Sequence, residues 1–333
     1  MTTEFQQDTG DAWGVHWAPG GGEAGLPPVE VLHDPGDERS VMAAALAAHH
    51  PGRGQITVHP TPVSTMRATL AHDVLRALGK SPLANAPQYD FWASGSVLPW
   101  RAVAAWISVL GITRLVICRA QGISPSQWTG LLALRALPGI RLVLVIHGRA
   151  PAPLKRLLDS FDHCSIDSAD ALAPPNCAAS SGKPIPWRHA GTVYPASPNA
   201  PWCDLPPPPR RPASDSIRPY KPVVARKKQT ADSVRQDSVA ADRIHAHIAH
   251  PVYAAIVAVR FLTGCTTRQA TLIRLPKAEL IAWAPAWAQP LVAAASRYQQ
   301  LTAAPGQSSV FSLMPREYEA VEEALHSCRL RPS

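Results

Sequence analysis

The sequence has few of the features from which a function can be read directly. It holds six cysteines in 333 residues, and none of them forms a CxxC pair: Cys118, Cys164, Cys177, Cys203, Cys265 and Cys328. This scatter excludes a CxxC-type metal or redox motif. Such cysteines are typical of a reducing compartment, so we expect buried thiols and no disulfides.

Long apolar runs are also missing. The most apolar stretch, "AVAAWISVLGITRLVIC", is interrupted by Gly111 and Arg114 and is too short to span a bilayer. The N-terminus, "MTTEFQQDTGDAW", is acidic and polar, unlike a signal peptide. We therefore predict a cytoplasmic protein without a membrane partner.

Signatures of catalysis are absent as well. No G-x-S-x-G nucleophile elbow occurs. On a helix the nitrogens of His245, His247 and His250 would point in diverging directions, which does not suit a zinc site. We predict no catalytic residue and no metal ligand, and hence a protein that is not an enzyme.

What the sequence does contain is proline and positive charge. Many of the 35 prolines cluster between residues 173 and 222, which marks a linker. The formal net charge of +8 favours an anionic partner, nucleic acid before membrane. Hydrophobic residues make up 46% of the chain, enough to bury a core on each side of the linker.

The pattern predicts four segments. Residues 1–27 form a disordered tail, and 28–170 alternate apolar runs (29–33, 55–60, 113–120, 141–148) with helical ones (40–50, 61–78, 100–110, 125–137). Continuous apolar strands separated by helices indicate a doubly wound α/β domain with a parallel sheet. Residues 171–238 form a disordered, basic, Pro-rich linker. Residues 239–333 form a small all-α domain with helices at 239–249, 251–263, 266–274, 276–283, 286–299 and 315–328.

The stretch "HDPGDERS", residues 33–40, stands where a P-loop would stand, between a strand and a helix. Against the variant G-P-P-G-x-G-K-S, it keeps Pro35, Gly36 and Ser40, and Arg39 keeps the positive charge. His33 and Glu38 replace glycines, and Asp37 adds a second carboxylate beside Glu38. At about 4 Å like charges repel by roughly 1 to 4 kcal/mol. Gly36, Arg39 and Ser40 therefore mark a non-functional phosphate position, and we expect neither ATP nor magnesium as a cofactor.

Two later stretches extend this comparison. They are "ITVHPTPVSTMRATLAHDVLRALGKSP" and "LVICRAQGISPSQWTGLLALRALPGIRLVLVIHG". Together with the P-loop position they resemble AAA+ ATPases of the transposition-regulator type. The resemblance places Cys118 and Arg119 where the acids of a DEAQ-like box would stand, and His147 at the sensor position. It implies an ATPase-like fold that has lost hydrolysis. An unrelated flavodoxin-like or Rossmann-like domain and an active ATPase remain alternatives.

The C-terminal stretch "LTGCTTRQATLIRLPKAELIAW" supports two DNA-binding interpretations. One is a helix-turn-helix in which Arg268, Gln269 and Lys277 read bases. The other resembles the helical domain of tyrosine recombinases, with Thr266 in place of the catalytic arginine. Basic residues of the linker would contact phosphates: Arg210, Arg211, Arg226, Lys227 and Lys228. A helical bundle without DNA contact is the alternative.

These observations predict a non-catalytic, DNA-associated accessory or regulatory protein built on an inactivated ATPase-like domain, with the mobile-element origin that the resemblance implies. The alternatives are an interaction scaffold without DNA contact and a divergent ATP-binding protein. The expected partner is DNA or another protein.

Overall fold

The computed structural model describes residues 26–80, 97–136, 140–173, 231–273, 277–302, 310–311, 313 and 317–330. Residues 1–25 of the predicted tail and most of the predicted linker lie outside these residues. So do Arg210, Arg211, Arg226, Lys227 and Lys228, as well as Cys177 and Cys203.

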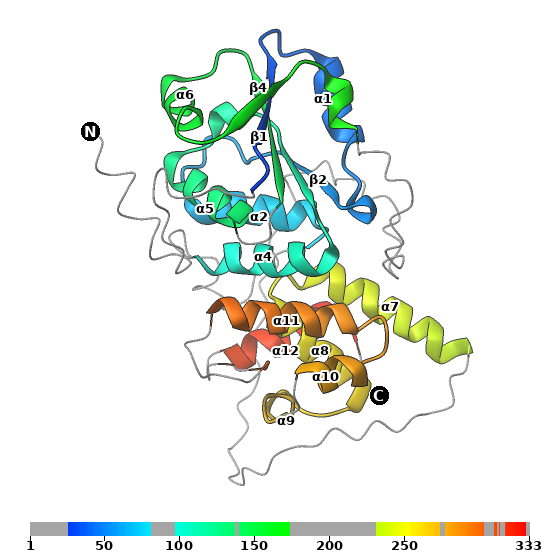
Figure 1. The fold of residues 1–333 in the computed structure, drawn as a ribbon. Coiled ribbons are helices and arrows are strands. Elements are labelled where there is room, and N and C mark those ends of the chain that lie inside the picture. Colours follow the sequence, from blue (N-terminus) through cyan, green and yellow to red (C-terminus); the bar gives the residue numbers. More distant parts are fainter. Residues whose placement is uncertain are drawn as a thin grey trace.

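A five-stranded, all-parallel sheet forms the centre of the α/β part (Figure 1). Its strands are β1 (Val29–Asp34), β2 (Gln55–Val58), β3 (Arg114–Ile117), β4 (Arg141–His147) and β5 (His163–Ile166). They lie side by side in the order β2-β3-β4-β1-β5. The predicted α/β class and parallel sheet are confirmed.

The strand order can be compared with those of Rossmann-like and flavodoxin-like folds, which the sequence left as alternatives. The apolar run of β4 lies at the centre, between β3 and β1, and six of its seven residues are buried. The common doubly wound orders are 3-2-1-4-5-6 and 2-1-3-4-5. The observed order is neither of these, so the sheet does not match a Rossmann-like or flavodoxin-like domain.

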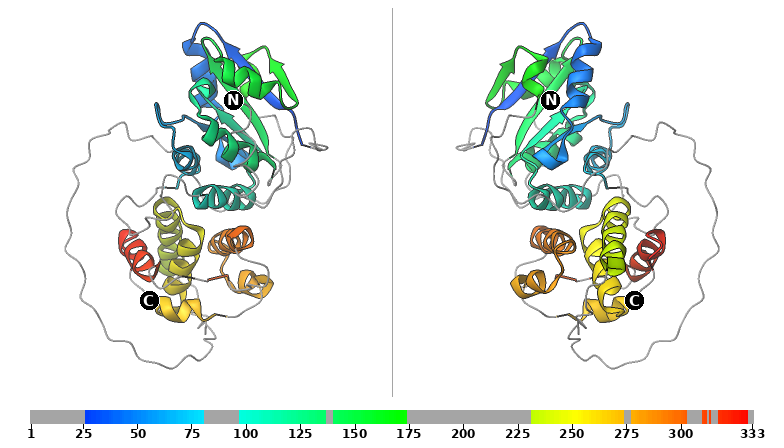
Figure 2. Two further views of the ribbon diagram at one scale, coloured as in Figure 1. Left: turned by 90° about the vertical axis from the view of Figure 1, so that its left-hand side faces the viewer. Right: turned by 90° about the vertical axis from the view of Figure 1, so that its right-hand side faces the viewer.

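Helices cover both faces of the sheet (Figure 2). On one face α1 (Arg39–Ala47) and the short helix η3 (Ala169–Leu172) pack over Leu32, Val116 and Val143. The other face packs against four helices: α2 (Arg67–Ala77), α4 (Leu98–Leu110), α5 (Pro125–Ala136) and α6 (Ala152–Leu158). Two further short helices, η1 (Pro51–Arg53) and η2 (Ala120–Gly122), lie in the connections.

Proline and glycine set the limits of the longest apolar helices. In α4, Pro99 lies in the first turn, where no amide donor is needed, and Gly111 ends the helix with a φ of 65°. The helix α8 (Pro251–Thr263) likewise begins at Pro251 and ends at Gly264 with a φ of 68°. A left-handed residue at these ends favours glycine.

The described C-terminal residues are helical. They form α7 (Ala231–His247), α8, α9 (Thr267–Thr271), α10 (Lys277–Trp283), α11 (Gln289–Thr302) and α12 (Glu317–Ser327). These helices are not joined to the α/β part by the linker alone. In Figure 1, α11 runs directly beneath α4, and one continuous apolar core includes both parts. A separate all-α domain is therefore not confirmed.

Buried polar contacts reinforce this junction. Trp106 of α4 donates its indole N–H to the carbonyl of Ala249 at 2.8 Å. The Lys80 amine contacts the ring of His245 and lies 3.9 Å from the centre of the Trp106 ring. Lys80 is fully buried, and burial lowers its pKa well below the usual value.

Several predicted details need correction. The helix expected at 61–78 begins at Arg67, because Asp73 holds the preceding loop through the amide (2.7 Å) and hydroxyl (2.8 Å) of Thr61. Helix α7 begins at Ala231, inside the range assigned to the linker. Cys118, Cys265 and Cys328 are buried as predicted, whereas Cys164 is exposed on β5.

Candidate functional site at the carboxyl ends of β1 and β4

The neighbouring strands β1 and β4 continue into helices on opposite faces of the sheet. The chain leaves β1 toward α1, and it leaves β4 toward α6 (Figure 1). In open α/β sheets, ligands bind in the crevice beyond the carboxyl ends of strands at such a switch point. The side chains that end β1 and β4 are Asp34 and His147.

Asp34 binds the start of the following helix. Its carboxylate oxygens accept the backbone N–H of Glu38 at 3.1 and 2.9 Å, and Glu38 is the N-cap residue of α1. The Nδ1 atom of His147 lies 2.8 Å from Asp34 Oδ2, and both side chains are almost fully buried. The chain's own carboxylate thus takes an amide that a phosphate would need at a helix N-terminus.

Asp37 and Arg119 form an exposed ion pair on the outer side of Asp34 and His147. Asp37 has a φ of 50°, and its Oδ1 lies 3.2 Å from His147 Nδ1. The guanidinium of Arg119 binds both oxygens of Asp37, at 3.2 and 3.3 Å. Arg119 also has a positive φ, of 49°. Its position follows β3, where the resemblance to AAA+ ATPases placed a degenerate acid box.

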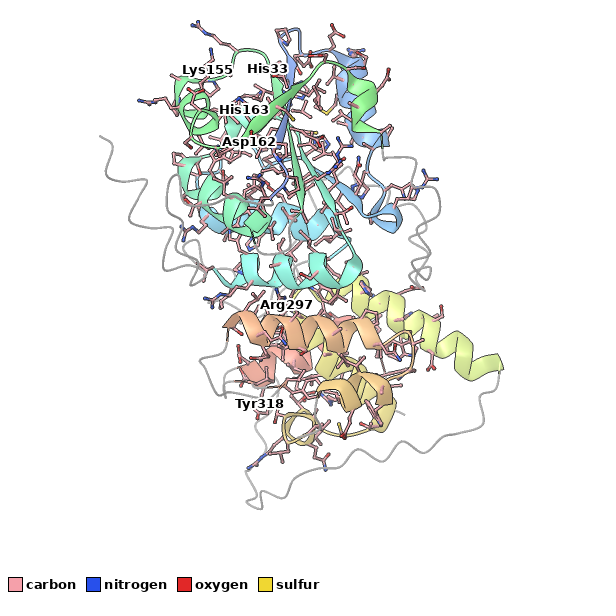
Figure 3. The ribbon with its side chains drawn as sticks, in the orientation of Figure 1. His33, Lys155, Asp162, His163, Arg297 and Tyr318 are labelled. Atoms are coloured by element: carbon pink, nitrogen blue, oxygen red, sulfur yellow. The ribbon has the colours of Figure 1, made fainter. Side chains whose placement is uncertain are left out.

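The residues of the predicted P-loop position lie on the surface. Gly36, Arg39 and Ser40 are exposed, and the hydroxyl of Ser40 donates to Glu38 Oε2 at 3.0 Å. Glu38 has an extended backbone with a φ of −71°. His33, which replaces the first glycine of the pattern, is exposed at the carboxyl end of β1 (Figure 3).

Two histidines at this edge have a buried ring nitrogen. Nε2 of His147 and Nε2 of His59, which follows β2, have no hydrogen-bond partner in the part of the chain that is described. Burial lowers the pKa of His59, and the charges of Arg119 and His147 lower it further. Burial also raises the thiol pKa of the nearby Cys118 to about 12, so this thiol stays protonated at neutral pH.

The chemistry of the crevice is therefore that of an acidic cluster around a buried imidazole. Three carboxylates, those of Asp34, Asp37 and Glu38, lie close together in sequence at the end of β1. Of these three, Arg119 pairs with Asp37. Carboxylates so placed repel an anion such as phosphate and attract a cation. The sign of the charge is opposite to that of a P-loop.

Local sequence patterns do not bring these residues together. They predict that Asp37 disfavours phosphate, and they place His147 and Arg119 at separate positions. The signal was present, because "HD" ends one buried run and "IH" ends another. Only the strand order, with β1 beside β4, makes Asp34 and His147 neighbours.

The predicted DNA-reading residues lie on α9 and α10. Arg268 and Gln269 are exposed on α9, and Lys277 is the first residue of α10. Thr266, which the sequence resemblance aligns with the recombinase arginine, caps α9, and the side-chain oxygen Oε1 of Gln269 accepts the backbone N–H of Thr266 at 2.8 Å. The main neighbours of α9 are α8 and α12, whereas α10 packs on α11.

No described helix combines the length and the apolar character that crossing a membrane requires.

Comparisons of the chain with protein families, with characterised proteins and with solved structures find no match.

Proposed function

We propose that this chain is a non-catalytic accessory protein that associates with DNA and carries an α/β part whose nucleotide position no longer binds nucleotide. The observation that supports this proposal most is the Asp34 carboxylate on the amide of Glu38. The origin in an ATPase of a mobile element rests on the sequence resemblance and stays a prediction.

The physical argument concerns charge and donors. Phosphate binding at a helix N-terminus depends on free backbone N–H groups and a positive local field. Here Asp34 takes one such amide, and His147 holds the carboxylate in place at 2.8 Å. The carboxylates of Asp37 and Glu38 stand nearby, each able to repel a phosphate oxygen by roughly 1 to 4 kcal/mol at about 4 Å.

The support for DNA comes from charge. The chain carries a formal net charge of +8, and Arg268 is exposed at the start of α9. We propose that the basic linker residues contact phosphates, because their contribution requires no particular sequence. We propose that Arg268, Gln269 and Lys277 contact base edges.

A titration of the full-length protein with Mg-ATP tests the proposed loss of nucleotide binding. We expect no binding at about 1 mM, which corresponds to a binding free energy weaker than about −4 kcal/mol. The double variant Glu38→Gly with Arg39→Lys, which restores the glycine and the lysine, should gain weak affinity. Magnesium-dependent ATP hydrolysis by the wild type that is lost in Ser40→Ala would overturn the proposal.

Measurements of DNA binding at several salt concentrations test the proposed association with DNA. Replacing the five linker residues by alanine should weaken binding to all duplexes and flatten the dependence on salt. Replacing Arg268 and Lys277 by alanine should instead reduce discrimination by roughly 1 to 3 kcal/mol per lost base contact. The control is Lys155→Ala with Arg156→Ala, two exposed basic residues of α6, and it should leave discrimination unchanged.

An interaction scaffold without DNA contact is the second candidate. It is favoured by the loop between β2 and α2, where Val63 is 98% exposed with a φ of 63° and Met66 is 52% exposed. Failure of the full-length chain to bind any duplex at about 50 mM salt would favour this second function over the first.

A further inference from the structure

We propose that the side-chain cluster at the carboxyl ends of β1 and β4 binds a divalent transition-metal ion, Zn²⁺ before others, through Asp34, Asp37 and His147. One ligand atom from each of these side chains lies within 4.8 Å of the other two. They come from the end of β1, the loop after it and the end of β4. The proposal does not depend on DNA or nucleotide binding.

The spacing of the ligand atoms fits a small cation. In a tetrahedral zinc site with bonds of about 2.0–2.1 Å, neighbouring ligand atoms lie about 3.3 Å apart. Here His147 Nδ1 lies 2.8 Å from Asp34 Oδ2 and 3.2 Å from Asp37 Oδ1. Each separation needs to widen by about 0.5 Å at most to admit the ion.

The state of His147 is an independent indication of a ligand. Its side chain is 1% exposed, Nδ1 points at two carboxylates, and Nε2 has no hydrogen-bond partner among the described residues. Nδ1 carries at most one hydrogen, so two carboxylates compete for a single donor. With the hydrogen on Nε2 instead, a lone pair would face both carboxylates. A cation at Nδ1 replaces the missing hydrogen and serves all three groups at once.

The ligand set selects the kind of cation. One imidazole and two carboxylates suit zinc and similar first-row ions, whereas magnesium and calcium prefer oxygen ligands only. Asp37 is 50% exposed, so the ion has a route from solvent and room for water in the remaining position. The guanidinium of Arg119, on the outer side of Asp37, competes with the ion for this carboxylate.

Because of this competition, substitutions of Asp37 and of Arg119 should change the zinc affinity in opposite directions. Metal-free full-length protein is titrated with Zn²⁺ in the presence of a chromophoric chelator, without nucleotide or DNA. We expect one equivalent to bind, and Asp37→Asn to lose about tenfold or more in affinity. Arg119→Ala should bind several times more tightly, because it removes both the competing partner of Asp37 and a nearby positive charge. Mg²⁺ should not displace the zinc.

Matched variants separate this site from adventitious binding. Asp159→Asn and Arg156→Ala change exposed residues of the α6 region, and His163→Gln changes an exposed histidine of β5. All three should bind zinc like the wild type. Co²⁺ serves as a spectroscopic probe, and its visible absorption should change in His147→Gln when circular dichroism shows that the variant is folded.

The proposal is overturned if no stoichiometric binding occurs, or if Asp37→Asn binds as tightly as the wild type. It is also overturned if His163→Gln alone removes the binding, since the ion would then sit on β5. Because neither readout involves nucleotide or DNA, failure here leaves the proposed function untouched, and failure of DNA binding leaves the metal site untouched.

Discussion

Single buried ionisable residues determine how this protein should respond to acid. His250 precedes α8 and is buried, with its ring stacked on Tyr253 at 3.9 Å between centroids. Burial lowers its pKa from 6.5 to about 3. Below pH 6.5 the unfolded chain therefore binds a proton that the folded chain does not, and stability falls as the pH drops from 6.5 toward 3.

We expect His250→Phe to lose less stability on acidification than the wild type. The phenyl ring can keep the stack on Tyr253 but cannot take up a proton. Each pKa unit corresponds to about 1.4 kcal/mol, so the wild type should lose several kcal/mol more than the variant between pH 6.5 and pH 3. Urea unfolding at a series of pH values measures this difference. The exposed His163→Phe serves as the control and should follow the wild type; equal acid dependence in His250→Phe would contradict the expectation.

At the scale of the element, the interior of the sheet was predictable and its margins were not. Apolar runs such as "RLVLVI" leave a buried parallel strand as the simplest solution, and β4 confirms it. By contrast, β5 reads His163-Cys164-Ser165-Ile166, and its first three residues are exposed. An edge strand paired on one side needs no apolar pattern, so the sequence carried no signal for it.

The candidate site was predictable in position but not in chemistry. The strand-loop-helix at residues 33–40 is confirmed, whereas the expectation that its carboxylates disfavour phosphate stays a prediction. The partners of those carboxylates lie 113 residues away for Asp34–His147 and 82 for Asp37–Arg119. Contacts between residues so far apart in the sequence depend on the order of the strands, which local sequence patterns do not specify.

Helix packing gives a prediction at Gly130 of α5. A Cβ atom added there would lie 2.3 Å from the Trp100 indole, which is fully buried and bound to the carbonyl of Arg67 at 3.1 Å. Alanine normally gains about 1 kcal/mol over glycine inside a helix. We expect Gly130→Ala to lose roughly 1–3 kcal/mol instead, because the indole cannot move without overpacking the core.

Thermal and urea unfolding of the purified variant check this loss. The control is Gly122→Ala, because a Cβ atom at Gly122 meets nothing within 4 Å. It should stay within about 0.5 kcal/mol of the wild type. A stabilised Gly130→Ala would show that α4 and α5 are not in this close contact.

At the scale of the whole molecule, the C-terminal helices share one apolar core with the helices and strands of the α/β part. The helices α8 and α11 pack on each other, and α11 packs on α4, which in turn packs on α2 and α5. Trp106, Lys80 and Ala249 join the two parts in the interior. A fragment ending near residue 170 would therefore expose the outer face of α4, so functional tests belong on the full chain.

The apolar core shared by the α/β part and the C-terminal helices can be tested at Trp106. Trp106 is fully buried, so Trp106→Ala should cost about 3–5 kcal/mol. If the core is one cooperative unit, that loss should appear equally in the hydrogen exchange of β4, in the sheet, and of α8, in the C-terminal helices. Leu46→Ala, at a residue 47% exposed on α1, should change neither. Faster exchange confined to α8, with β4 as protected as in the wild type, would show instead that the C-terminal helices unfold on their own. The cluster of Asp34, Asp37 and His147 would then depend on the folding of the α/β part alone.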